Sequence, residues 1–287
     1  MKSINIAKRV VFLFFLSAFM VITAACATVA SPGAMQTKSE TVEVGSADSV
    51  RVMIDGGFGE LYVEGGASNL LAADFRYNID QLEPEVNYDV SGGAGRLTVS
   101  NRDNINVIPT GEVKSEWDLQ FADDVPLEMD INLGLGDSNL DLSDLTVTSL
   151  EVSAGAGKLD LNVGNQTLDR LKIDAGLGDV NVDVAGGSIG RLDYQSGAGS
   201  TRIDLRGAWD DDLVATIEGG LGDLTVIVPR ETAVRVDVSL GLGEVKADGF
   251  RIDGSAYVND AYEEGGDVLL SIDIQGGAGS VTLEMGE

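Results

Sequence analysis

A Gly-x-Gly triplet that recurs at a nearly fixed spacing is the feature that most constrains the fold of this chain. Between Met129 and Lys246, the first glycines of successive triplets are separated by 21, 21, 21, 23 and 21 residues, and three further copies flank this block. A fixed period of about 20–50 residues is typical of repeat proteins, in which one supersecondary unit is stacked many times. The predicted structural glycine corners are Gly57, Gly59, Gly93, Gly95, Gly134, Gly136, Gly155, Gly157, Gly176, Gly178, Gly197, Gly199, Gly220, Gly222, Gly241, Gly243, Gly277 and Gly279.

The residues around each triplet alternate between apolar and polar, as in strands with one buried face. In one unit the apolar positions run on even numbers from Leu150 to Ala156 and on odd numbers from Leu159 to Val163. Such a reversal needs a bend or bulge between two strands, which glycine permits because it tolerates positive φ and has no Cβ. The pattern predicts an all-β fold, a single-stranded β-helix or solenoid-like stack of about nine strand–Gly-x-Gly–strand repeats.

The N-terminus has the features of a targeting signal. Lys2, Lys8 and Arg9 precede an apolar run from Val10 to Ala25, which is short for a membrane-spanning helix. The run ends in small residues before Cys26, the one cysteine of the chain, and so resembles a bacterial lipoprotein box. We therefore expect a lipoprotein signal peptide over residues 1–25 and a lipid on Cys26. Cleavage after Ala30, which would release the protein, is the alternative.

The rest of the chain divides by the regularity of its repeats. Residues 26–40 lack periodicity and are predicted to form a flexible tether. Residues 41–125 hold two triplets with longer insertions and are predicted to form an N-terminal β domain, followed by a repeat domain over 126–287. We expect the last coil, residues 268–285, to close the C-terminal end of the stack.

The charge of the chain excludes some partners and reactions. It has 47 acidic and 19 basic residues, a formal net charge of −28, and no histidine. Such a charge argues against binding of nucleic acid. Without histidine there is no His-based triad and no His metal ligand. We predict no enzyme activity, no cofactor and no metal site, with a carboxylate-only hydrolase as an alternative.

The residue after each triplet varies, and this variation bears on calcium binding. In order, these residues are Asp137, Lys158, Asp179, Ser200, Asp223 and Glu244. A row of calcium ligands would not include a lysine, so the column indicates charge relief between adjacent coils. The acidic clusters at 210–212 and 263–267 are interpreted as solvated loops, with an oxygen-ligated calcium ion as the alternative.

Four aromatic residues are candidates for contact with a ligand. A sugar or a peptide could stack on an exposed ring, whereas the alternative is use in the core or in a cap. These residues are Trp117, Trp209, Tyr257 and Tyr262.

Two stretches resemble known bacterial families. Residues 41–100, above all Asp55–Leu61 and Glu83–Tyr88, resemble the N-terminal domain of the toast-rack family. Residues Gly222–Pro229 and Val234–Gly243 are similar to the C-terminal domain of Lia-type cell-wall-antibiotic response proteins and of adhesin-like domains. The resemblance implies a β-solenoid-like stack on the outside of a bacterial membrane. Lia-type proteins carry several membrane helices before this domain, whereas this chain has only its signal segment.

These observations favour a non-catalytic, lipid-anchored β-solenoid of the cell envelope. We expect it to act as an adhesin-like binding or structural module whose partner is an envelope protein or polysaccharide. By resemblance to the Lia-type proteins, the alternative is a regulator of envelope-stress signalling. A carboxylate-dependent enzyme that acts on polysaccharide is the third hypothesis.

Overall fold

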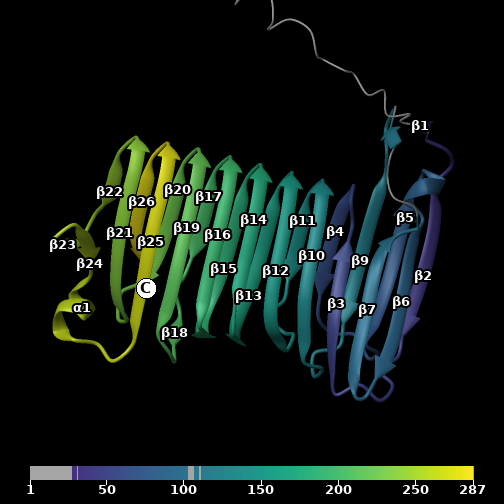
Figure 1. The fold of residues 1–287 in the computed structure, drawn as a ribbon, viewed down its shortest axis with the longest axis horizontal. Coiled ribbons are helices and arrows are strands. Elements are labelled where there is room, and N and C mark those ends of the chain that lie inside the picture. Colours follow the sequence, from purple (N-terminus) through teal and green to yellow (C-terminus); the bar gives the residue numbers. More distant parts are fainter. Residues whose placement is uncertain (1–27, 31, 103–106, 110, 287) are drawn as a thin grey trace, which may run out of the picture.

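The computed structural model describes residues 28–30, 32–102, 107–109 and 111–286. Most of these residues form two long β-sheets that lie face to face along one axis (Figure 1). Each sheet has 12 strands within the described part of the chain. The fold is the nearly all-β stack that the repeat predicts.

The first sheet contains the strands that lead into the glycine triplets. From the N-terminal to the C-terminal end of the stack, its strands are β6 (Pro84–Ser91), β7 (Ala94–Asn101), β3 (Ser49–Asp55), β10 (Leu127–Leu135), β12 (Val147–Ala156), β14 (Leu171–Leu177), β16 (Arg191–Ala198), β19 (Leu213–Leu221), β25 (Leu269–Ala278), β21 (Ala233–Leu242), β24 (Ala256–Val258) and β23 (Arg251–Asp253).

The second sheet contains the strands that leave the triplets. In the same direction, its strands are β2 (Gln36–Val42), β5 (Leu71–Tyr77), β9 (Ser115–Phe121), β4 (Glu60–Glu64), β11 (Ser138–Asp141), β13 (Leu159–Leu168), β15 (Val180–Ile189) with β18 (Ala208–Trp209) beside it, β17 (Thr201–Asp204), β20 (Leu224–Pro229), β26 (Val281–Gly286) and β22 (Val245–Ala247). Outside both sheets lie the paired strands β1 (Thr28–Ala30) and β8 (Val107–Pro109), the 3₁₀ turn η1 (Asp80–Leu82) and the helix α1 (Asp260–Glu264).

The regular coils pair in parallel, and equivalent residues of successive coils stand side by side. Leu150 of β12 pairs with Leu171 of β14, and Leu159 of β13 pairs with Val180 of β15. Alternate residues of each strand point inward, so equivalent apolar residues form columns along each sheet. The columns of the two sheets pack against each other between the sheets. One continuous core therefore runs through the stack, and no coil has to bury its apolar face alone.

This core also crosses the boundary expected between residues 125 and 126. Strand β10, the first of the regular block, pairs on one side with β3 and on the other with β12. Val52 of β3 and Ile131 of β10 belong to the same buried cluster as Ile173 of β14. The two predicted segments thus share a single hydrophobic core.

The N-terminal end of the stack differs from the prediction in two places. The tether expected over 26–40 is too long, because Gln36–Val42 forms β2, which is held by antiparallel backbone pairing with β5 rather than by an apolar pattern. The triplet Gly93–Gly95 is not a corner of the solenoid. Gly92 and Gly93 have φ of 61° and 84° and form the turn of the antiparallel β6–β7 hairpin, while Gly95 lies buried in β7.

The C-terminal end corrects the expected order of the coils. The last coil in the sequence, β25 with β26, does not close the stack. It lies between the β19–β20 coil and the β21–β22 coil and pairs in parallel with both (Figure 1). The insertion that connects β22 to β25 forms β23, β24 and α1, which cover the outer end of β21.

Asn259, fully buried, organises this C-terminal cap. Its side-chain amide donates to the backbone carbonyls of Pro229, Arg230 and Thr232. Its side-chain oxygen accepts from the backbone N–H groups of Val234 and Tyr262, the second of which lies in the first turn of α1. One amide therefore satisfies backbone groups of the β20–β21 connection and of the insertion, as buried polar groups require.

Candidate functional site

Eight of the nine predicted glycine corners form one long edge of the molecule. The second glycine of each regular triplet has a φ between 137° and 146°. Its N–H continues the hydrogen-bond ladder around the corner, as when Gly178 N donates to Ala198 O at 2.9 Å. A Cβ on Gly178 would overlap the carbonyl oxygen of Gly157 in the coil below. Both the backbone conformation and the close stacking of coils therefore require glycine.

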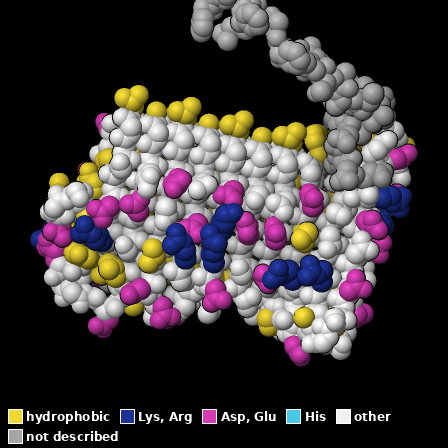
Figure 2. Space-filling model, in the orientation of Figure 1, with side chains coloured by type: hydrophobic (Ala, Val, Ile, Leu, Met, Phe, Trp, Pro, Cys, Tyr) yellow, Lys and Arg dark blue, Asp and Glu magenta, His cyan; other side chains and the backbone are white. Residues whose placement is uncertain are grey.

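The residue between the two glycines points outward, contrary to the inward face that the alternation predicts. We call these residues the corner row; in spatial order they are Phe58, Leu135, Ala156, Leu177, Ala198, Leu221, Ala278 and Leu242. The leucine residues among them are 52% to 75% exposed. The row is visible as a line of hydrophobic side chains along the upper edge in Figure 2. The residue between the two glycines is not buried, because the chain bends there and turns its side chain away from the core.

Leucine and alanine alternate along the corner row, and a second alternation accompanies them. Each coil with a leucine carries an acidic residue two positions later, such as Asp137 or Asp179, whereas each coil with an alanine carries lysine or serine there. Asp137 Oδ1 accepts from Lys158 N at 2.8 Å, and Asp223 Oδ1 accepts from Ser280 N at 3.0 Å. The acidic side chain thus binds the backbone of the next coil, so the true repeat is a pair of coils. The column therefore joins coils through hydrogen bonds, a role that the charge pattern alone did not predict.

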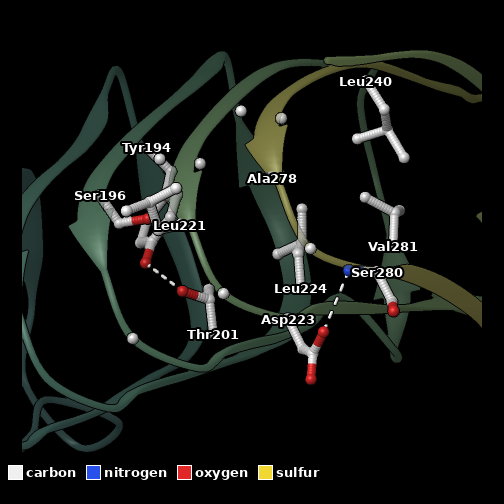
Figure 3. Close-up of a pocket in the computed structure, with 17 residues that line it drawn as sticks. Tyr194, Ser196, Thr201, Leu221, Asp223, Leu224, Leu240, Ala278, Ser280 and Val281 are labelled. Atoms are coloured by element: carbon white, nitrogen blue, oxygen red, sulfur yellow. Dashed lines mark hydrogen bonds between the residues drawn. The ribbon is translucent and has the colours of Figure 1, made fainter. Parts of the chain in front are cut away.

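A small, partly open cavity lies between the two sheets next to the 23-residue coil (Figure 3). Tyr194 occupies the core position that Ile173 and Ile217 hold in neighbouring coils, and its hydroxyl lies 2.6 Å from Thr201 Oγ1. Burial raises the pKa of the Tyr194 hydroxyl. The cavity beside this pair is about 20 Å³, because Gly219 has no side chain to fill it. A water molecule would fit, but ligand pockets measure about 300–1,000 Å³.

Two shallow grooves lie on the outer face of the first sheet. One, of about 640 Å³, is lined by Arg51, Arg96, Asp89 and Glu128 near the N-terminal end. The other, of about 410 Å³, crosses β14, β16 and β19. Figure 2 shows Lys and Arg side chains gathered in separate groups between Asp and Glu side chains. These grooves are open surfaces suited to an extended partner rather than to a small molecule.

The second groove contains a compact group of basic side chains, which is unusual in so acidic a chain. Arg170 and Arg191 both contact Asp193, each with an N···O distance of 2.7 Å, and Lys172 contacts Glu151 and Asp174. Hydrogen bonds from Arg191, and then from Arg170, hold the pKa of Asp193 below its ordinary value against the effect of burial. We call Arg170, Lys172, Arg191 and Asp193 the basic cluster.

The structure places the other candidates in structural roles. Trp117 and Trp209 are 2% and 7% exposed, so the structure shows use in the core, which was the alternative to an exposed ring that a ligand could stack on. Trp117 packs edge-on against Phe75 in the core, and Trp209 Nε1 donates to Leu205 O. Tyr257 and Tyr262 are half-buried in the C-terminal cap.

The acidic clusters also contact the protein itself. Asp212 Oδ1 accepts from the backbone N–H of Leu269, and Glu263 forms an ion pair with Arg251. Among the described residues, no group of three Asp, Glu, Cys or His side chains is arranged to hold a metal ion. Cys26, the predicted lipidation site, lies outside the described residues. In the part of the chain that the structure describes, no helix is long and apolar enough to span a membrane.

Comparison with known proteins agrees with this architecture. The family described as the N-terminal domain of toast_rack matches residues 31–183 and 165–227, which together make up more than half of the chain. The chain belongs to the toast-rack family. The match extends beyond the residues on which the sequence resemblance rested, and it includes five of the regular corners of this toast-rack stack.

Similar solved structures include two bacterial proteins. One is a candidate cell adhesion protein from Clostridium sporogenes, with 21% identity and a TM-score of 0.48; the match covers 88% of this chain and all of that one. Another is a candidate adhesin from Bacteroides fragilis, with 15% identity and a TM-score of 0.46; the match covers 88% of this chain and 99% of that one. No curated protein matches the toast-rack chain at the sequence level.

Proposed function

We propose that this protein is a non-catalytic, adhesin-like module of the bacterial cell envelope, held at the outer side of a membrane by a lipid on Cys26. Its partner is an extended envelope polymer, a polysaccharide or a protein, bound along the outer face of the first sheet. The name of the Clostridium sporogenes protein refers to cell adhesion, which accords with this role but does not carry it.

The basic cluster in the second groove is the observation that carries the proposal. A net charge of −28 repels most acidic polymers of the envelope, so a local group of three basic side chains is where such a polymer could approach. The parallel strands repeat every ~4.8 Å, which gives a polymer evenly spaced contacts. Arginine also suits carboxylate and phosphate groups, because its guanidinium donates two parallel hydrogen bonds.

The competing explanation is that the cluster only stabilises the sheet. Ion pairs across neighbouring strands contribute roughly 0.2–1 kcal/mol each without any partner. The two explanations differ in what charge reversal does, because a purely structural cluster would affect stability and leave binding unchanged.

Reversal of two charges tests the proposal. Arg170→Glu with Arg191→Glu should reduce retention of the protein on isolated cell envelopes at least tenfold. The matched control is Lys158→Glu with Lys246→Glu, which reverses two exposed charges, one just before β13 and one in β22, and should leave retention unchanged. Thermal melting of both variants identifies any loss caused by unfolding. Equal retention of the two double variants would contradict the assignment of the binding face.

Treatment of the envelopes separates the two classes of partner. Loss of retention after protease digestion identifies a protein, whereas loss after digestion of polysaccharide identifies a glycan. Release of new reducing sugar ends by the intact protein would contradict the non-catalytic assignment.

A further inference from the structure

The corner row is an exposed apolar surface that nothing in the described chain covers. Leu177, Leu221 and Leu242 are 61%, 63% and 75% exposed. Each stands between two glycines, so no adjacent side chain shields it from solvent. From Leu135 to Leu242 the row takes six inter-strand steps, about 29 Å at ~4.8 Å each. A continuous apolar line of this length is typical of an interaction surface.

The N-terminal end of the described chain lies at the same edge. Strand β1, which begins at Thr28 and pairs with β8, stands at the upper end of the stack in Figure 1, on the side of the glycine corners. Val113, a few residues after β8, packs in the same small cluster as Phe58, the first member of the corner row. The described chain therefore begins at the corner edge, at Thr28, close in sequence to Cys26.

We infer that the corner row lies on the surface of the lipid bilayer that holds the N-terminus. The leucine side chains enter the zone between the headgroups and the acyl chains, and the long axis of the stack is parallel to the membrane. This inference rests on the proposed lipid anchor at Cys26. The anchor supplies the attachment, and the row fixes the orientation, because stable and oriented binding generally combines two signals.

A bilayer suits this surface better than a second copy of the chain does. The row occupies an edge about 10 Å wide, the distance between two packed sheets, and so offers roughly 300 Å². A specific protein interface buries about 800 Å² on each partner. In a dimer across this edge, the carboxylates of Asp137, Asp179 and Asp223 would also approach their counterparts. A zwitterionic bilayer requires neither a large matched surface nor an opposite charge.

The orientation has a consequence for the proposed binding face. With the corner edge on the membrane, the outer faces of both sheets stand upright, and the polar turns of the opposite edge point away from the lipid. The basic cluster is then accessible from the side, to a polymer that runs along the membrane surface.

Spin labels at the two ends of one strand test the inference. Strand β21 begins just after Glu231, on the turn edge, and ends at Leu242, on the corner edge. Leu242 is the member of the row farthest along the stack from β1, so a chain held only by its N-terminus has no reason to bring it to the membrane. The full-length lipidated protein, with Leu242→Cys or the control Glu231→Cys, is labelled with a nitroxide and mixed with phosphatidylcholine vesicles. Because the lipid occupies Cys26, the new cysteine is the only free thiol.

The readout is the collision of each label with oxygen and with a water-soluble nickel chelate. We expect the Leu242 label to become at least threefold less accessible to nickel and more accessible to oxygen than the Glu231 label. The accessibility of the same label in the Cys26→Ser chain without vesicles shows how far neighbouring protein atoms alone restrict collisions. Equal accessibility of the two labels in vesicle-bound protein would overturn the inference while the lipid anchor stands.

Two further outcomes are also decisive. If the protein does not float with the vesicles, the lipid anchor of the proposed function is wrong, and the orientation inferred from it is wrong too. If Leu242 labels broaden one another in the absence of vesicles, a second copy covers the row and the bilayer is not its occupant.

Discussion

Gly178, at the corner after β14, and Gly219, within β19, differ in which atoms an added Cβ would contact. At Gly178, φ is +139° and a Cβ would overlap the carbonyl oxygen of Gly157. At Gly219 the nearest atom to a Cβ is Ser196 Oγ at 4.0 Å, on the side of the small cavity. Gly178→Val should therefore reduce the free energy of unfolding by about 2–4 kcal/mol, through backbone strain and displaced coils. Gly219→Ala should raise it by about 0.4–1 kcal/mol, because alanine restricts the unfolded chain.

Urea unfolding of both variants measures this difference. A second control is Asp179→Asn, next to Gly178 and exposed, which should change the free energy of unfolding by at most about 0.5 kcal/mol. If Gly178→Val proves as mild as this control, the corner does not require glycine.

A buried carboxylate gives the stack its dependence on acid. Asp204 is 5% exposed and accepts hydrogen bonds from Arg206 and from Arg202. Burial acts to raise the pKa of Asp204, but the hydrogen bonds and charge of Arg206 outweigh it and leave the pKa below its ordinary value. The unfolded chain, with an Asp pKa of about 3.9, then takes up the proton first. The stabilisation is present above about pH 4 and is lost as the pH falls through the folded pKa.

Removal of either partner should reduce this acid dependence. We expect the free energy of unfolding of Asp204→Asn and of Arg206→Gln to fall less between pH 5 and pH 2.5 than that of the unchanged protein, in urea titrations at each pH. Retention of the full acid dependence in both variants would show that other carboxylates cause it.

Single residues show where sequence reasoning succeeds and where it fails. The glycine corners were predictable because the apolar residues switch from even to odd positions across each triplet, and few backbone structures other than a bend or bulge allow that. The outward direction of Leu177 was not, because an alternating pattern does not say at which residue a strand leaves the core. For Trp117 and Trp209 the sequence left surface and core use open, because a large ring in a short strand gives no sign of which sheet face it occupies; the structure buries both.

At the scale of the coil, the order of elements follows from an alternation in the sequence. Coils with Gly-Leu-Gly and an acidic residue alternate with coils that have Gly-Ala-Gly and lysine or serine. In sequence order the coils of Leu221 and Leu242 would be neighbours and would break this alternation. Insertion of the Ala278 coil between them restores it, so that Asp223 binds the backbone of Ser280. The alternation of the triplets therefore indicated that the Ala278 coil lies between the other two. The 21-residue spacing alone indicated that the coils stack in sequence order.

Engineered cysteine pairs test this order. Thr216 of β19 pairs with Asp273 of β25, and Asp273 pairs with Asp237 of β21 on its other side. Thr216 and Asp273 are one strand spacing apart, about 4.8 Å, whereas Thr216 and Asp237 are about 9.6 Å apart. In the Cys26→Ser chain, Thr216→Cys with Asp273→Cys should form a disulfide on mild oxidation. Thr216→Cys with Asp237→Cys should remain reduced, because disulfides rarely span more than about 7 Å between Cα atoms.

Thiol counting and mass spectrometry of the oxidised chains give the result. The reverse outcome, a disulfide only in the second pair, would mean that the coils follow one another in sequence order.

At the scale of the whole molecule, the edge strands at both ends of the stack have features that disfavour further pairing. An open parallel stack exposes unpaired N–H and C=O groups that would recruit another chain. At the N-terminal end the edge strands β6 and β2 run antiparallel to their neighbours and carry charged residues such as Glu85 and Lys38. At the C-terminal end the edge strands β22 and β23 have only 3 residues each, and β22 carries Lys246. Short, charged edges are a common means of keeping a sheet from growing.

The charge of the molecule opposes the same aggregation and has a cost in stability. A formal net charge of −28 spreads repulsion over the outer faces, where ion pairs such as Arg51–Glu128 offset only part of it. Salt should screen this repulsion, since the Debye length falls from about 30 Å at 0.01 M to about 3 Å at 1 M. We expect sodium chloride to stabilise the fold by on the order of 1 kcal/mol over this range, a rise in melting temperature of about 2–4 °C.

Calcium chloride at equal ionic strength separates general screening from a specific site. In the two acidic clusters at 210–212 and 263–267, Asp211 accepts from the Ser188 hydroxyl, Asp212 accepts from the backbone N–H of Leu269, and Glu263 pairs with Arg251. The two salts should therefore raise the melting temperature by the same amount, measured by calorimetry at pH 7. A larger rise with calcium that a chelator reverses would establish a cation site, and Asp212→Asn and Glu263→Gln would then show which cluster holds it. Without that difference, the acidic residues serve to keep the stack soluble and its faces free of other chains.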